Sequence, residues 1–279
     1  MRKHLNVYSN KLILNKKYTV LLIIFVALTI GGFGVYYLNI PKEIEPARKQ
    51  IIETDSFVYE DVELNWIVIA GFKLKKGDTV VYVDPKDVNR KNNSILEPAD
   101  YIIITHDHAP HYNPLDMHYL SDSETIWITS PNIRISREKQ QTVYPGDIIE
   151  FEDIRFEFVP SYNLDKRYPS GELFHPPEHQ NLGVIIDFDG TRIYHTGDSD
   201  VIPDMADIDT DIALLPVSGY AWMTALEALD AVELLKISSD LNYVIPIHYG
   251  YNQGTDTNAL IFSTQVNCSV VILPRLFER

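Results

Sequence analysis

Cysteine is almost absent from this sequence. Cys268 is the only one among 279 residues. A single cysteine cannot form an internal disulfide, and it cannot supply the several thiolates of a cysteine-rich zinc site. We therefore exclude a disulfide-stabilised scaffold, and we expect Cys268 to be a small core side chain near the C-terminus.

Positive charge is also scarce. The chain has 24 Lys and Arg against 39 Asp and Glu, for a net charge of −15. Five of the basic residues lie in the first forty positions, which contain no acidic residue, so the remaining chain has 19 basic against 39 acidic residues. A body this acidic repels phosphate backbones, and we expect no nucleic-acid partner.

Residues 18–40 contain no charged side chain at all. A membrane-spanning helix needs about 20 apolar residues, so this segment is long enough. The basic residues that precede it predict a cytoplasmic N-terminus and an extracytoplasmic body. A cleaved signal peptide is the alternative, but the basic segment is long and no Ala-x-Ala site follows the apolar run. A buried core helix is the least favoured interpretation.

The expected domain organisation follows from these boundaries. Residues 1–17 form a basic cytoplasmic tail and residues 18–40 a single-pass transmembrane anchor. Residues 41–55 are charged and contain two prolines, which predicts a linker, helical in part around residues 46–52. Residues 56–279 form the folded domain.

Short apolar runs predict strands through most of this domain. We expect them at 62–69, 72–75, 79–83, 101–104, 125–129, 148–151, 154–160, 182–188, 192–195, 212–217, 243–247 and 270–273. Helices are expected at 114–120, from the Thr224/Glu227 capping box to about Lys236, and around 258–266. In the second helix the predicted buried stripe comprises Leu226, Leu229, Val232, Leu234 and Leu235.

Three histidines follow the predicted strand 101–104. His106, His108 and His111 fall within six positions, and Pro110 suits the tight turn that would bring them together. Open α/β sheets bind ligands at the carboxyl ends of their strands. Neutral imidazole is a good ligand for zinc and related metals. A surface loop that merely contains histidines is the alternative, but nine histidines in 279 residues should rarely cluster in this way.

Other candidate metal ligands also lie at strand ends or in a long loop. Asp198 follows one predicted strand and His248 another. His175 or His179 lies in the segment 161–181, which has no periodicity, and such long loops are often functional. Asp84 ends the strand 79–83, where it either hydrogen-bonds a metal-bound histidine or caps a turn. His118 is predicted to be a surface residue of the helix 114–120.

Several motifs resemble the metallo-β-lactamase superfamily, and within it the lactonase-like group of small hydrolases. They are Val83-Asp84-Pro85, Ile104-Thr105-His106-Asp107-His108-Ala109-Pro110-His111, Phe174-His175-Pro176-Pro177-Glu178, Ile193-Tyr194-His195-Thr196-Gly197-Asp198-Ser199, Leu214-Leu215-Pro216-Val217-Ser218-Gly219 and Ile245-Pro246-Ile247-His248-Tyr249-Gly250. The resemblance covers roughly residues 57–279. It implies an α/β (α+β) fold, a four-layer αββα sandwich, in an enzyme that uses one or two zinc ions.

The resemblance also implies the ligands, which are shared between two metal positions. His106, His108 and His175 would hold the first metal, His111 and His248 the second, and Asp198 would bridge them. His175 is preferred to His179 because the Phe-His-Pro context matches the family. His195 matches a position that is not a usual ligand.

Pro110 departs from the family pattern, which has an aspartate ligand of the second metal at this position. We therefore expect the second metal to bind weakly or not at all. One zinc can suffice, because it lowers the pKa of bound water to about 7. The resulting hydroxide would attack an ester, lactone, phosphodiester or amide in a small-molecule substrate, and Asp198 or His248 would handle the proton.

The rival hypothesis is a degenerate, non-catalytic metal-binding or sensory module of the same fold. Pro110 is its best support, whereas the otherwise complete ligand set argues against it. A nuclease of the same fold is disfavoured by the acidic body.

Overall fold

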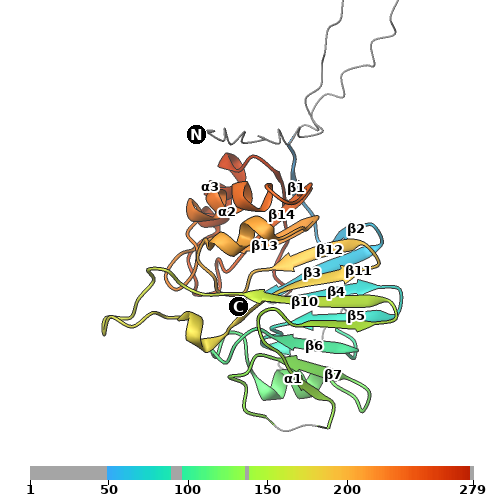
Figure 1. Ribbon diagram of the computed structural model, residues 1–279. Helices are drawn as coiled ribbons and strands as arrows, with labels where there is room; N and C mark the ends of the chain where they lie inside the picture. The colour runs from blue at the N-terminus through green and yellow to red at the C-terminus, as the bar shows by residue number, and fades with distance from the viewer. Residues whose placement is uncertain (1–48, 89–95, 136–137, 277–279) are drawn as a thin grey trace, which may run out of the picture. The chain divides into compact units, whose positions relative to one another are not determined.

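Strands form most of the regular structure, as the short apolar runs predict. The computed structural model describes residues 49–88, 96–135 and 138–276 (Figure 1). The predicted tail at 1–17 and anchor at 18–40 lie outside these residues. Within the described ranges, no helix is both long and apolar enough to cross a membrane.

The larger of two sheets has eight strands in the order β1-β15-β14-β13-β12-β11-β10-β9. The strands are β1 (Ile51–Glu53), β9 (Ile148–Phe151), β10 (Ile154–Pro160), β11 (Leu182–Phe188), β12 (Thr191–His195), β13 (Ile212–Pro216), β14 (Tyr243–Ile247) and β15 (Ser269–Ile272). Strands β9 to β12 pair antiparallel, and β12 to β15 pair parallel.

The smaller sheet has seven strands in sequence order. They are β2 (Phe57–Tyr59), β3 (Val62–Val68), β4 (Gly71–Lys76), β5 (Thr79–Val83), β6 (Tyr101–Ile104), β7 (Ile126–Thr129) and β8 (Gln140–Thr142). Strands β2 to β5 pair antiparallel, whereas β5 to β8 are parallel.

The two sheets share one hydrophobic core. Tyr101 of β6 meets Phe156 of β10 with 5.1 Å between ring centres, and Phe57 of β2 meets Tyr243 of β14 at 5.0 Å. Strand β10 alternates buried and partly exposed residues, so one of its faces is wet, as its alternating sequence predicts. The protein is therefore a mixed α/β sandwich, as expected for the metallo-β-lactamase fold.

Three helices accompany the sheets: α1 (Pro114–Leu120), α2 (Glu227–Leu235) and α3 (Asp256–Gln265). Helices α2 and α3 lie beside β13 and β14, and α1 lies beside β6 and β7 (Figure 1). The described residues also include two short 3-10 turns, η2 (Pro177–His179) and η3 (Pro203–Asp207). The predicted capping box is confirmed: Glu227 N donates to Thr224 Oγ1 at 3.2 Å, and Thr224 N donates to Glu227 Oε2 at 2.7 Å.

The buried face of α2 agrees in part with the predicted stripe. Val232 and Leu235 are buried as predicted, and Leu229 and Leu234 are partly buried against the core, whereas Leu226 is 58% exposed. The helix also buries Ala228 and Ala231, which lie on the same face as Val232 and Leu235 at helical spacing. The prediction was wrong for Leu226, and it missed the two alanines because it favoured large side chains.

Strand β1 was not predicted. Ile51–Glu53 pairs parallel with Val270–Ile272 of β15, where the sequence suggested a partly helical linker. Its three residues have no strong periodicity of their own, and the pairing depends on β15, more than two hundred positions away. The folded domain therefore begins before the expected boundary at residue 56.

Carboxyl ends of strands from both sheets meet at one edge of the sandwich. His248, just after β14, donates its backbone N–H to Ile69 O at 3.0 Å, and Leu182 N donates to Thr105 O at 3.1 Å. These hydrogen bonds join the carboxyl end of β14 and the amino end of β11 to loops of the smaller sheet. They bring residues from both sheets to a common edge.

Candidate metal centre

The histidine segment after β6 forms the expected tight turn. The backbone N–H groups of His111 and Tyr112 both donate to His108 O at 2.9 Å. The turn brings the His106 ring to 4.0 Å from the His111 ring and 4.8 Å from the His108 ring, measured between centres. His106 and His111 are fully buried, whereas His108 is partly exposed.

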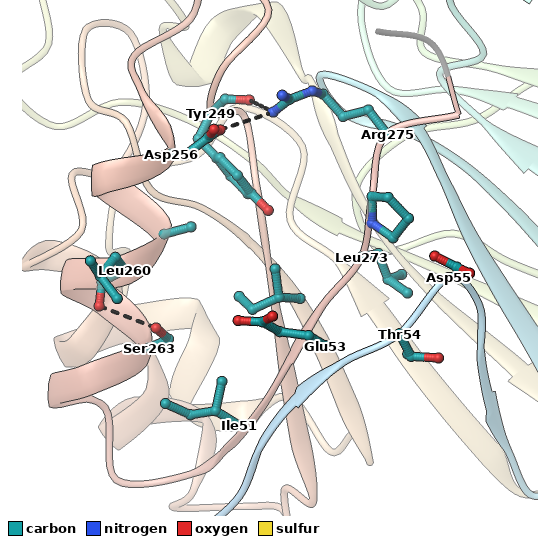
Figure 2. A pocket seen from close by; sticks show the side chains of 13 residues that line it. Ile51, Glu53, Thr54, Asp55, Tyr249, Asp256, Leu260, Ser263, Leu273 and Arg275 are labelled. Carbon is teal, nitrogen blue, oxygen red and sulfur yellow. Dashed lines mark hydrogen bonds and ion pairs between the residues drawn. The ribbon is translucent and has the colours of Figure 1, made fainter.

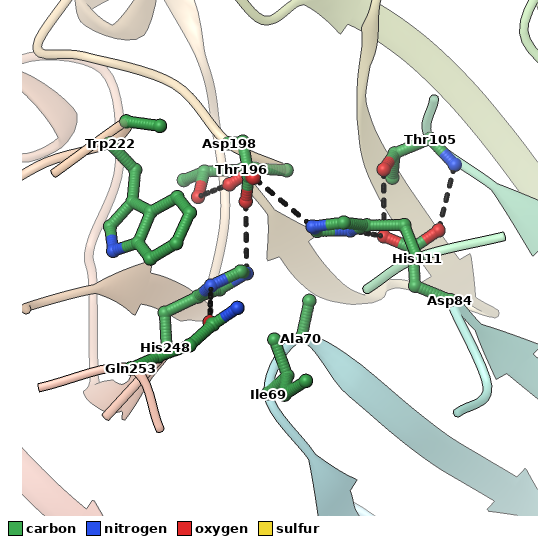
Figure 3. Close-up of polar contacts among 12 residues, drawn as sticks. Ile69, Ala70, Asp84, Thr105, His111, Thr196, Asp198, Trp222, His248 and Gln253 are labelled. Atoms are coloured by element: carbon green, nitrogen blue, oxygen red, sulfur yellow. Dashed lines mark hydrogen bonds and ion pairs between the residues drawn. The ribbon is translucent and has the colours of Figure 1, made fainter. Parts of the chain in front are cut away.

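Asp198 lies between His111 and His248 (Figure 3), and it is also close to two further imidazoles. Its Oδ2 is 3.1 Å from His111 Nε2, 3.6 Å from His106 Nε2 and 3.7 Å from His175 Nε2. Its Oδ1 is 2.9 Å from His248 Nε2. One carboxylate that follows β12 thus contacts histidines that follow β6 and β14 and one from the long loop.

Gly197 makes the Asp198 turn possible. Its φ is +61°, and a Cβ at this position would lie 2.6 Å from Leu182 O. A side chain here would be strained by the backbone conformation and would also clash with the neighbouring strand. Glycine therefore lets the chain turn at this point, so that Asp198 reaches the cluster.

The long loop contributes His175 and not His179. His175 is buried, and its Nε2 lies 3.0 Å from His108 Nδ1. Asn163 Oδ1 accepts from the His175 backbone N at 2.9 Å and lies 3.0 Å from Nδ1, and Ala221 O lies 3.1 Å from the same Nδ1. These acceptors favour a proton on Nδ1 and leave the Nε2 lone pair directed at the cluster. His179 lies exposed on η2.

Asp84 contacts the outer nitrogen of a candidate ligand histidine. A hydrogen bond to such a histidine is one of the two roles that the sequence suggests for Asp84. Its Oδ2 is 2.7 Å from His111 Nδ1 and accepts from Thr105 Oγ1, also at 2.7 Å (Figure 3). The opposite carboxylate oxygen accepts from Thr105 N at 2.8 Å. On the other side of the cluster, Gln253 Oε1 is 2.8 Å from His248 Nδ1. Such partners orient the histidine rings of metal sites.

The histidines fall into two electrostatic groups. Burial lowers the pKa of His106 well below its usual value, and it also lowers the pKa of His108 and of His175, the latter to about 4. Burial would lower the pKa of His111 as well, but Asp198 and Asp84 outweigh it and raise the pKa to about 10. His111 is therefore cationic at neutral pH when no metal is present.

Asp198 is the charged partner of this cation. Burial opposes its ionisation, but His111 and His248 outweigh burial and hold its pKa well below the usual value. The carboxylate is therefore ionised at neutral pH. An ionised carboxylate among neutral imidazoles is a suitable ligand set for a divalent ion.

The donor geometry also fits a metal. Two trios each place their ligand atoms within 4.8 Å of one another, His106 with His108 and His175, and His106 with His111 and Asp198. Within the described part of the chain, His106 Nε2 is buried and has no hydrogen-bond partner. His248 Nε2 and Asp198 Oδ1 face each other without the alignment of a hydrogen bond and have no other partner in the same residues. Buried polar atoms of this kind suit the coordination of a metal ion.

The remaining histidines named above lie apart from this cluster. His118 is exposed on α1, as predicted. His195 is buried, and its Nε2 contacts Ala70 O at 2.8 Å. It joins the two sheets and contributes no ligand.

A cavity of about 560 Å³ opens beside the cluster. His108, His175 and Asp198 form its inner end, and Ala109 and Pro110 form part of its wall. Pro110 thus lies beside the cluster but offers no ligand atom to it.

A larger cavity, of about 830 Å³, lies elsewhere, between α3, β1 and the end of the chain (Figure 2). Its polar groups include Glu53, Asp256 and Arg275, and Arg275 Nη1 is 3.2 Å from Asp256 Oδ1. It has no histidine in its lining. Because candidate metal ligands line the smaller cavity and not this one, we take the smaller cavity as the candidate site.

Three residues around the cluster were missed by the sequence analysis. Asn163 lies in a segment without periodicity, and Gln253 lies in the loop after β14. Thr105 was quoted only as part of the motif, although its hydroxyl contacts both Asp84 and, at 3.0 Å, His106 Nδ1. Only the position of Thr105 at a strand end could have indicated such a role.

Comparison with known proteins identifies the family. The profile of the β-lactamase superfamily domain matches residues 63–248. A UPF0173 metal-dependent hydrolase of Sulfurisphaera tokodaii is 30% identical over 207 residues, which cover 67% of this chain and 84% of that protein. One of Thermus thermophilus is 28% identical over 198 residues, with the same two coverages.

A solved structure supports the assignment. A candidate metal-dependent hydrolase of Parabacteroides distasonis superposes with a TM-score of 0.63 at 28% identity, covering 78% of this chain and 96% of that one. The fold, the clustered histidines and the sequence matches agree. This chain therefore belongs to the β-lactamase superfamily and, within it, to the family of UPF0173 metal-dependent hydrolases.

Proposed function

We propose that this chain is a membrane-anchored, zinc-dependent hydrolase of a small-molecule ester, lactone, phosphodiester or amide. The main support is the arrangement of Asp198, a buried and ionised carboxylate that contacts four imidazoles at the inner end of a cavity. Imidazole nitrogens with one carboxylate are a ligand set that suits zinc.

His106, His108 and His175 are the proposed ligands of the first zinc, with Asp198 completing the set. Bound there, zinc supplies a hydroxide nucleophile at neutral pH and polarises the bond under attack. His111 and His248, with Asp198, are the proposed ligands of a second ion, which Pro110 weakens. Outside them, Asp84 holds the His111 ring and Gln253 the His248 ring.

Asp198 and His248 are the proposed groups for proton transfer. Asp198 is ionised at neutral pH, so it can accept a proton during the attack. His248 Nε2 lies 2.9 Å from Asp198 Oδ1, so His248 is close enough to take a proton from Asp198. The proton can then pass to the leaving group.

The test uses the full-length protein with 4-nitrophenyl acetate, bis(4-nitrophenyl) phosphate and a simple lactone. Treatment with a chelator should abolish hydrolysis, and added zinc should restore it. His106→Ala should lower zinc affinity and activity by at least about 100-fold, because even the loss of an outer partner commonly costs 10–100-fold. His118→Ala, a matched change on the surface of α1, should leave both unchanged.

Retained activity in His106→Ala would contradict the scheme. Tight zinc binding without hydrolysis of any of these compounds would instead favour the non-catalytic, sensory alternative. Restoration by another divalent ion but not by zinc would overturn the choice of metal.

The proposed anchor is residues 18–40, with the tail 1–17 in the cytoplasm and the domain from residue 56 onward, together with β1, outside it. It is supported by the absence of charge in this segment and by the five basic residues before it. The protein should stay in the membrane fraction after alkaline carbonate extraction, and protease added to intact cells should digest the domain. Release by carbonate, or protection from the protease, would contradict the anchor or its orientation.

A further inference from the structure

We infer that the cavity beside the metal centre binds an uncharged carbonyl compound that carries a flat apolar group, and that it excludes phosphodiesters and other anions. The inference rests on the proposed function and narrows its substrate class. It depends on three features of the cavity: a continuous aromatic wall, an apolar wall where the family has a carboxylate, and a lining without a Lys or Arg.

Aromatic rings line the cavity from its mouth to the metal ligands. Trp222 lies beside the His248 ring, with 4.4 Å between ring centres (Figure 3). Tyr220 is 6.4 Å from Trp222 and 4.9 Å from Phe174, and Phe174 is 4.1 Å from Tyr168. Rings in such contact offer a wall against which a flat group can stack.

Tyr220 is held at the mouth of this cavity by its loop. Its side chain is 76% exposed, although it is large and partly apolar. Its φ of +89° is unfavourable for a residue other than glycine, so the surrounding structure must hold the backbone in this conformation. Gly219 N donates to Met223 O at 3.0 Å and Met223 N donates to Ser199 O at 3.2 Å, which fixes the loop. Strained residues of this kind cluster at ligand sites.

Ala109 and Pro110 add an apolar part to the lining. Both line the cavity, and neither offers a charge or a hydrogen-bond donor from its side chain. Where the resemblance implies an aspartate, Pro110 therefore gives apolar surface to the cavity and no ligand atom.

Among the residues that the structure describes, the cavity lining contains no Lys or Arg. The nearest cations in sequence to the aromatic wall are engaged elsewhere: Lys166 Nζ contacts Glu227 Oε1 at 2.6 Å, and Arg167 Nη1 donates to Gly171 O at 2.8 Å. Enzymes that transfer phosphoryl groups usually use Arg, Lys or several metal ions to neutralise the oxygens. Apart from the proposed metal, a phosphodiester would find no Lys or Arg among the described residues of this lining, and it would meet a chain of net charge −15.

The test is a binding experiment on the full-length, chelator-treated protein with three compounds that share a phenyl ring. Acetanilide is uncharged, phenylphosphonate is an anion, and phenyltrimethylammonium is a cation. Without metal, the phosphonate cannot gain affinity by ligating zinc. Ligand-observed NMR should show acetanilide binding at least about tenfold more tightly than phenylphosphonate.

Tyr220→Ala should weaken acetanilide binding by about 2- to 10-fold, the usual contribution of an aromatic pair, whereas Tyr220→Phe should retain it. Tyr144→Ala is the matched control, because Tyr144 is another exposed tyrosine and is not part of this lining. It should leave binding unchanged.

Four outcomes would overturn the inference: equal or tighter binding of phenylphosphonate, tightest binding of phenyltrimethylammonium, no effect of Tyr220→Ala, or no binding of any probe. The second of these would point to a cationic substrate, because aromatic rings also attract cations. Since this binding needs neither zinc nor turnover, its failure leaves the hydrolysis test intact, and a failure of hydrolysis leaves the binding result intact.

Discussion

The two halves of the candidate metal centre contain similar side chains in opposite electrostatic states. In the first half, burial lowers the pKa of His106, His108 and His175, so their rings are neutral at neutral pH. In the second half, His111 lies between Asp84 and Asp198, which raise its pKa to about 10. The first half therefore presents neutral imidazole rings, whereas the second half contains His111 in its protonated, cationic form.

This difference bears directly on metal binding. An ion that enters the first half meets imidazoles that need not lose a proton, whereas an ion in the second half must displace a proton from His111. In the second half, Pro110 also stands where the resemblance implies an aspartate ligand. The sequence departure and the electrostatics therefore both predict that the first position fills before the second.

The largest expected effect comes from Pro110→Asp, which should remove this difference. The added carboxylate supplies a ligand to the second half and favours a divalent ion there. We expect the zinc content of the full-length protein to rise from about one to about two ions per chain. Metal analysis after removal of excess zinc measures the change.

Pro110→Ala is the control for this experiment, because it removes the proline ring without adding a ligand. It should keep the native stoichiometry. Two tightly bound zinc ions in the native chain would show that another group replaces the aspartate and that the two halves are equivalent.

A second prediction separates the halves through their outer partners. Asn163→Ala removes one of the two acceptors of the His175 ring, and also the acceptor of its backbone N–H, so it should weaken the first zinc by about 10–100-fold. Gln253→Ala makes the matching change beside His248 and should alter the affinity of the first zinc by less than about threefold. Zinc titration against a chelator of known affinity measures both. Equal losses of affinity for the first zinc in the two variants would mean that the two halves do not bind metal independently.

Local sequence signals predict the metal-centre edge well. Strand β6 has the predicted bounds, and the histidine turn follows it directly, because a buried apolar run and its end are encoded within a few residues. The same holds for His248 after β14. Parallel strands end at a common edge, so residues that follow them can be grouped without knowledge of the packing.

Features that depend on distant partners could not be predicted in this way. Asn163 orients His175 from within a loop that has no periodicity, and β1 exists because β15 offers a free edge. The buried face of α2 depends on Ala228 and Ala231, whose small side chains give little hydrophobic signal. Each of these contacts joins segments whose approach is set by tertiary packing.

The smallest expected effect is a gradual one, and it tests the protonated state of His111. Its pKa of about 10 in the metal-free fold lies above the value of about 6.5 for an unfolded histidine. A pKa raised on folding stabilises the fold fully below the unfolded value, and this stabilisation is lost as the pH rises through the folded value. The free energy of unfolding of the metal-free protein should therefore fall steadily between about pH 6.5 and pH 10, so that most of this loss has already occurred at pH 9.

Urea unfolding at pH 7, 8 and 9 measures this slope, and His111→Gln provides the reference because glutamine keeps polar atoms but cannot become charged. The difference in unfolding free energy between the native chain and this variant should shrink as the pH rises. Other groups that titrate near pH 9 affect both proteins and cancel in the difference. A difference that stays constant would mean that His111 is neutral in the folded protein, and the contrast between the two halves would then rest on Pro110 alone.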